Sequence, residues 1–242
     1  LLQQPYQCHS RQPQQSPLAQ TGRGFALTRP GGLNRQLRVV LWIFFMLGGT
    51  PLTAVAQSPD CSNMQTQRDL NTCAGLNWER ADLALNEAFQ ALTPNLSESR
   101  KSALVEAQLQ WIEFRDAECQ FSSSWAQGGS LQPALAAGCL AGLTEQRTIE
   151  LKSYSQGEYL PALTDNYGSV RQQLNDVSRQ LQQRLSASRQ LELEAANQAW
   201  VNFRETACEF ERSGGGDSAL TNCLIRLTET RIDRLQNYLD SP

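Results

Sequence analysis

The sequence predicts an all-α protein built from two tandem three-helix units, six helices in total, with disulfide-stapled helical hairpins. Three observations predict this fold. The sequence repeats at an offset of 89 residues, apolar residues recur with helical spacing, and six cysteines follow a segment with the features of an export signal. No stretch shows the strict alternation that is typical of a β-strand. The repeat is the strongest of the three, and it sets the expected boundaries.

Two pairs of segments carry the repeat. "WIEFRDAEC" (111–119) matches "WVNFRETAC" (200–208). "CLAGLTEQRTIELKSY" (139–154) matches "CLIRLTETRIDRLQNY" (223–238), at an offset of 84 because the preceding loop is five residues shorter. Internal repeats of this length indicate duplicated structural units. We therefore expect a first copy over 57–160 and a second, diverged copy over 161–242.

Each copy is expected to contain three helices. Pro94 ends the first helix, Ser97 is a plausible N-cap of the second, and the glycine loops "QGGS" and "SGGGDS" separate the second helix from the third. The expected helices run roughly over 74–92, 98–124 and 131–154 in the first copy, and over 162–184, 187–212 and 217–239 in the second.

The first 56 residues have the composition of a leader, with five arginines and no acidic residue. Arg35 and Arg38 precede a short apolar run over 39–47, and Ala54-Val55-Ala56 has the small-x-small pattern of a cleavage site. We expect a secretory signal peptide over 33–56, because the apolar run is far shorter than the about 20 residues of a transmembrane helix. Once this signal is cleaved, we expect no membrane span. Residues 1–32 are expected to be a non-native or disordered leader, and the protein to be periplasmic or secreted.

Six cysteines remain after the signal peptide, and an even number in an exported chain predicts three disulfides. Two pairs flank the glycine loops, one in each copy, and are placed to staple the hairpins. The third pair would tie the segment after the signal to the first helix. The expected bonds are Cys61–Cys73, Cys119–Cys139 and Cys208–Cys223.

The shared motif lies on one helical stripe. At 100° per residue, Trp111, Phe114 and Arg115 share a stripe with Cys119, whereas Asp116 and Glu113 point away. The second copy keeps the stripe as Trp200, Phe203 and Arg204, and the third helices add Arg147 and Arg231. A stripe kept in both copies indicates a packing face rather than a catalytic centre.

Buried arginines on such a stripe need partners. Asp82, on the inner side of the first helix, is the candidate partner of Arg115 or Arg147. In the second copy Arg171 takes the place of Asp82, so this pairing cannot be common to both copies.

The residues after the signal peptide argue against an enzyme. They contain no histidine, the usual general base near neutral pH, and the cysteines are expected in disulfides rather than as nucleophiles or zinc ligands. The glycine stretches lack the lysine of a phosphate-binding loop, and the acidic residues are expected mostly on helix surfaces. We therefore expect no catalytic residues, no cofactor and no metal.

The charge of this part of the chain bears on its partner. With 16 basic and 24 acidic residues, its net charge is about −8. This charge argues against nucleic acid as a partner and favours a cationic one.

A set of short motifs resembles the LprI-type lysozyme inhibitor family. The pattern is Cys61…Asn71…Cys73, "ADLALN" (81–86), "AQLQWIEFRDAEC" (107–119), "GGS" (128–130) and "CLAGLTEQRTIEL" (139–151). The resemblance covers almost all of 61–155, and 163–240 is similar to a diverged copy that lacks the first cysteine pair. It implies an exported, helical, disulfide-bonded protein that inhibits a lysozyme.

Three functional hypotheses follow. The first is a non-enzymatic binding protein, a lysozyme inhibitor whose stapled loop 120–138 contacts a cationic lysozyme. The second is an envelope structural or adaptor module that binds another protein through its helical faces. The third is an envelope hydrolase that uses paired carboxylates.

Overall fold

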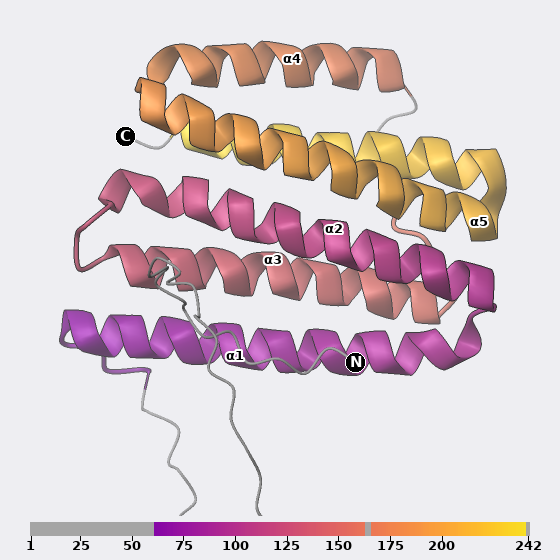
Figure 1. Cartoon of the computed structure of the whole chain (residues 1–242), viewed down its shortest axis with the longest axis horizontal. Helices are drawn as coiled ribbons and strands as arrows, with labels where there is room; N and C mark the ends of the chain where they lie inside the picture. Colours follow the sequence, from indigo (N-terminus) through magenta and orange to yellow (C-terminus); the bar gives the residue numbers. More distant parts are fainter. Residues whose placement is uncertain (1–60, 163–165, 241–242) are drawn as a thin grey trace, which may run out of the picture. The chain divides into compact units, whose positions relative to one another are not determined.

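The computed structural model describes residues 61–162 and 166–240, and the leader and signal peptide expected over 1–56 lie outside these residues. All regular secondary structure in the described ranges is helical, which confirms the all-α class (Figure 1). The elements are α1 (Gln67–Leu92), α2 (Glu98–Ser123), α3 (Gln132–Ser155), α4 (Tyr167–Arg184) and α5 (Ala187–Asp240), with short 3₁₀ turns η1 (Thr93–Asn95) and η2 (Ser124–Ala126).

Helix α5 consists of two arms joined at a bend. Gly216 has the non-helical angles φ 70° and ψ −162°. The Cα atoms of Cys208 and Cys223 are 5.4 Å apart, whereas 15 residues of straight helix would separate them by about 22 Å. The chain therefore turns back at Gly216 (Figure 1). Counted as continuous helices, the described residues hold five rather than the predicted six, because helix continues to either side of this one bend.

Local sequence explains where the helices begin. Thr66 caps α1: its hydroxyl accepts from the Asp69 amide, and the Asp69 carboxylate accepts from the Thr66 amide. This capping box starts α1 at Gln67, seven residues before the predicted start. Ser97 caps α2 as predicted, accepting a hydrogen bond from the Arg100 amide. Asn166 caps α4, which begins later than the predicted residue 162.

Neighbouring helices pack in the order α1, α3, α2, α5 and α4. The main apolar core lies between α1, α2, α3 and α5, and a smaller one forms where α4 and α5 meet the end of α2 around Phe121. The four motif aromatics are buried in the main core: Trp111, Phe114, Trp200 and Phe203. No helix in 61–162 or 166–240 has both the length and the apolar character needed to cross a membrane.

Three disulfides join Cys61 to Cys73, Cys119 to Cys139 and Cys208 to Cys223, the same pairs as those expected from the sequence. The last two bridge α2 to α3 and the two arms of α5. In the chain-entropy treatment, closing loops of this length stabilises the fold by roughly 3 kcal/mol per bond.

Candidate functional site

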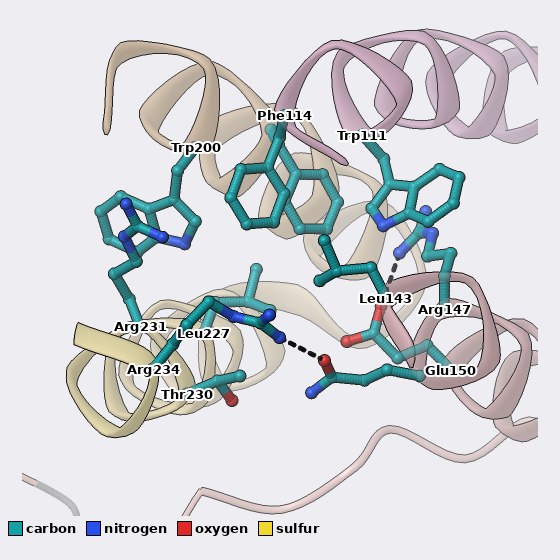
Figure 2. A pocket seen from close by; sticks show the side chains of 12 residues that line it. Trp111, Phe114, Leu143, Arg147, Glu150, Trp200, Leu227, Thr230, Arg231 and Arg234 are labelled. Atoms are coloured by element: carbon teal, nitrogen blue, oxygen red, sulfur yellow. Dashed lines mark hydrogen bonds and ion pairs between the residues drawn. The ribbon is translucent and has the colours of Figure 1, made fainter. Parts of the chain in front are cut away.

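A small pocket lies where the two copies meet, between α2 and α3 on one side and the two arms of α5 on the other (Figure 2). Its twelve lining residues form six pairs related by the repeat offsets of 89 and 84. The pairs are Trp111 and Trp200, Phe114 and Phe203, Leu143 and Leu227, Gln146 and Thr230, Arg147 and Arg231, and Glu150 and Arg234. Equivalent residues therefore face each other, as across the two-fold axis of a symmetric dimer.

Contacts inside the pocket repeat this symmetry. The rings of Phe114 and Phe203 are stacked, 5.8 Å apart and 3° from parallel. The Arg147 guanidinium lies 5.2 Å from the Phe203 ring centre, and the Arg231 guanidinium lies 5.8 Å from that of Phe114. Each copy thus places its arginine against the phenylalanine of the other, a favourable cation–π arrangement.

The hydrogen bonds of these two arginines are only partly symmetric. Arg147 Nε donates to Gln108 (3.1 Å), and Arg231 Nη2 donates to Asn197, the equivalent residue (2.7 Å). Their carboxylate partners are not equivalent. Arg147 pairs with Glu150 on its own helix, 2.7 Å away, while Arg231 pairs with Glu118 of the other copy, 2.6 Å away.

A further buried arginine, Arg226, extends these pairs between α3 and α5. It contacts Glu150 of the first copy (2.8 Å) and Glu211 of the second (2.6 Å). The Tyr154 hydroxyl donates to Glu211 as well, 2.6 Å away. We call this group the ionic seam: Glu118, Arg147, Glu150, Glu211, Arg226 and Arg231.

Burial and charge act in opposite directions on the acids of the seam. Burial tends to raise the pKa of Glu150, but Arg147 and Arg226 outweigh it and hold this pKa below its usual value. At Glu211 burial dominates and raises the pKa, although Arg226 and the Tyr154 hydroxyl oppose it. Glu118, Glu150 and Glu211 are exceptions to the expected placement of acidic residues mostly on helix surfaces. Arginines of the other copy pair with Glu118 and Glu150, and Arg226 of the same copy pairs with Glu211.

Arg115 and Arg204, although shared by both copies, do not line the pocket. Arg115 lies 5.1 Å from the Trp111 ring and Arg204 lies 4.7 Å from the Trp200 ring. Arg115 contacts Asp116 at 2.8 Å and Asp82 at 3.9 Å. Asp116 is exposed, as expected for a residue that points away from the stripe, and the long Arg115 side chain reaches it. Asp82 approaches Arg115, and Arg147 takes Glu150 instead.

The stapled loop predicted over 120–138 comprises the end of α2, the turn η2, a short connection and the start of α3. It is fixed from several sides. Besides the Cys119–Cys139 bond, Asn71 of α1 donates to the Ser130 carbonyl (3.1 Å), and Arg189 of α5 donates to the Ser124 hydroxyl (3.3 Å). Gly128, with φ 76°, makes the turn. The loop contains no charged residue, and Trp125, in the turn η2, is 59% exposed. It therefore presents an aromatic side chain on a fixed backbone.

The equivalent bend of the second copy, at Gly216, is covered instead. Tyr159, from the segment that links the two copies, packs so closely on Gly214 and Gly215 that a Cβ atom on either would overlap it. Arg100 of α2 donates to the Tyr159 hydroxyl (3.3 Å). Asn222 holds the same linker through bonds to the backbone of Leu160 and Ala162, each 2.8 Å.

The structure thus brings together six of the nine motif residues selected from the sequence. Trp111, Phe114, Arg147, Trp200, Phe203 and Arg231 line the pocket, and Arg115, Arg204 and Asp82 lie outside it. Sequence reasoning missed Glu118, because its equivalent is Ala207, and Arg226, because its equivalent is Gly142. A charged residue in one copy facing the opposite charge of the other is the signal that would have found them.

Fold and site define a class of protein: an all-helical, disulfide-bonded chain in which two copies of one unit meet through equivalent faces. Residues 58–151 and 152–235 each match the family described as Lysozyme inhibitor LprI. The two matches are adjacent and span more than half of the chain. The chain therefore belongs to the LprI lysozyme inhibitor family, in two tandem copies.

Two further proteins are similar to this chain, one in sequence and one in fold, and neither is described with a function. An uncharacterized protein of Rhizobium meliloti is 36% identical, over 42% of this chain and 83% of its own length. The crystal structure of an uncharacterized protein from Burkholderia thailandensis matches with a TM-score of 0.55 at 14% identity, covering 76% of this chain and 92% of the other. This second likeness is one of fold alone.

Proposed function

We propose that this protein is an exported, non-enzymatic inhibitor that binds a cationic lysozyme through the stapled loop 120–138. The observation that carries the proposal is the exposure of Trp125, which is 59% accessible on the stapled loop. Hydrogen bonds to α1 and α5 and a disulfide hold this loop in place. Large exposed aromatics are frequent hot spots of protein interfaces, and a fixed loop loses little conformational entropy on binding. Membership of the LprI family supports lysozyme as the partner.

The charge of the chain supports the same partner class. The residues after 56 carry a net charge of about −8 from 16 basic and 24 acidic side chains, which attracts a cationic protein. The three disulfides suit the oxidising compartment in which an exported inhibitor would act. We further propose that 33–56 is the signal peptide and that 57–160 and 161–242 are the two units.

Residues 57–242, titrated against a cationic lysozyme in a cell-wall lysis assay, test the proposal. We expect inhibition at micromolar concentrations, and a loss of at least tenfold in potency for Trp125→Ala. Leu191→Ala is the matched control, because Leu191 is 68% exposed in the second copy and lies outside the loop; its potency should be unchanged. Absence of inhibition by the unmodified chain at these concentrations would overturn the proposal.

The second candidate is the envelope adaptor. Exposed apolar residues on helix surfaces, such as Val105 and Leu109 of α2, 41% and 45% exposed, favour it. It predicts co-purification with a specific envelope protein and no effect on lysis. The lysis assay therefore separates the two candidates.

A further inference from the structure

We infer that the pocket between the two copies binds a small carboxylate that carries a methyl-sized apolar group. The pocket is about 30 Å³ in volume, which suits one or two water molecules or a single methyl-sized group. Phe114, Phe203, Leu143 and Leu227 supply carbon surface within it. The inferred site is separate from the stapled loop and does not depend on lysozyme inhibition.

Positive charge is in excess around the pocket. Three arginines and one carboxylate line it: Arg147, Arg231, Arg234 and Glu150. Arg147 is neutralised by Glu150 and Arg231 by Glu118, at 2.7 and 2.6 Å. Arg234 has weaker contacts, 3.3 Å to Gln146 and 4.0 Å to Glu118. The extra charge arises because Arg234 stands where the first copy has Glu150.

Figure 2 shows where this charge lies. The Arg234 side chain extends across the pocket toward the α3 side, and a dashed line marks its hydrogen bond to Gln146. Arg234 is about one-quarter exposed, with 25% of its side chain accessible, and Gln146 is exposed. A ligand entering from solvent would meet the Arg234 guanidinium and the Gln146 amide before it reached the apolar surface.

Two donor atoms of the pocket-lining arginines also have no hydrogen-bond partner. Arg147 Nη2 and Arg231 Nε are buried and have no hydrogen-bond acceptor within the described part of the chain, although both side chains are about 99% buried. Buried donors are nearly always satisfied, so an acceptor from outside the chain is expected. Water can satisfy these donors, whereas the excess charge of Arg234 at the mouth calls for an anion, and a carboxylate supplies both acceptor atoms and negative charge there.

The apolar surface selects among anions. A halide gains nothing from the phenylalanine and leucine side chains, while the terminal methyl group of a short carboxylate buries its surface against them. Short carboxylic acids and the C-terminal alanine of a peptide share this chemistry. Either could be the ligand, and the experiment distinguishes them.

Calorimetric titration of residues 57–242 with sodium propionate tests the inference, with sodium chloride and 1-propanol as probes of charge and carbon alone. We expect saturable millimolar binding of propionate and at least fivefold weaker response to either control. Arg234→Gln should weaken propionate binding at least fivefold. Arg179→Gln should not, because Arg179 is an exposed arginine of α4, with 65% of its side chain accessible.

Gln146→Glu gives a second variant at an exposed position, so the test does not depend on the folding of Arg234→Gln. Its added negative charge at the mouth should weaken propionate binding by a similar factor. Acetyl-Ala-Ala binding more tightly than propionate would identify a peptide terminus as the ligand, and the reverse a free acid. Equal responses to propionate and chloride, or no saturable response to propionate, would show that the pocket holds only solvent or a nonspecific ion.

Discussion

The two copies of the helical unit share their interior and differ at their bends. Both place a tryptophan, a phenylalanine and an arginine at the same interior positions, and both close the bend with a disulfide. The bend of the first copy lies beyond Ser124, at the end of α2, and that of the second packs near Arg100, at its start. These two residues are separated by about 36 Å of helix. The first bend leaves Trp125 exposed, and the linker covers the second.

This difference indicates how a duplicated unit can divide two tasks. In the second copy Tyr159 and Asn222 hold the linker against the bend, so that bend supports the joining of the copies. The five additional residues of the first loop are not used to hold the linker. The interior also combines shared and unshared features. The aromatic contacts are symmetric, whereas the ion pairs Glu118–Arg231 and Glu150–Arg226 both need one residue from each copy.

The largest effect is expected from breaking an ion pair that joins the copies. Glu118→Ala leaves Arg231 buried without its carboxylate, and both side chains are fully buried. Removing one partner of a buried pair typically costs about 3–5 kcal/mol. Asp176→Ala, which breaks the exposed Asp176–Arg179 pair of α4, should cost less than about 1 kcal/mol. Urea denaturation measures both, and similar values for the two variants would contradict a structural role of the seam.

An intermediate effect is expected at the covered bend. Gly215→Ala places a methyl group against the Ala219 Cβ atom and the Tyr159 ring. Such overpacking typically costs about 1–3 kcal/mol. Gly138→Ala in α3 is the control, since a Cβ atom there meets nothing within 4 Å, and alanine favours helix by up to about 1 kcal/mol. Thermal unfolding should therefore move in opposite directions for the two variants, and a stabilised Gly215→Ala would refute the contact.

The sequence was sufficient to predict the features that depend on local pattern or on the repeat. Ser97 as a cap, the stripe of Trp111 and Phe114, and cysteines flanking each bend all follow from neighbouring residues or from their equivalents in the other copy. The pairing of Glu118 with Arg231 could not be found in this way, because the partners are 113 residues apart and neither copy alone contains both.

The glycines of the second bend show a related limit. "SGGGDS" indicates a loop by composition, yet helix continues up to Gly216. Gly214 and Gly215 are required by the close approach of Tyr159 rather than by a turn. A tertiary contact, not a backbone preference, explains them, and no local pattern encodes that contact.

The smallest expected effect is the pH dependence of the stability contributed by the two acids that share Arg226. The two contributions should change with pH in opposite directions. Glu150 belongs to the first copy and its pKa is lowered: burial acts to raise this pKa, and Arg147 and Arg226 outweigh burial. Its contribution to stability is therefore present above the unfolded carboxyl pKa, about 4.3, and is lost as the pH falls below it. Glu211 belongs to the second copy and burial raises its pKa, so its contribution is greatest at low pH and is lost as the pH rises above about 4.3.

Urea denaturation of Glu150→Gln and Glu211→Gln between about pH 3.5 and 7 separates these contributions, because a tenfold change in the acid dissociation constant on folding corresponds to about 1.4 kcal/mol of stability. The stability of the unmodified chain relative to Glu150→Gln should decline toward low pH. Relative to Glu211→Gln it should decline toward neutral pH. Slopes of the same sign for the two variants would contradict the opposite pKa shifts of Glu150 and Glu211.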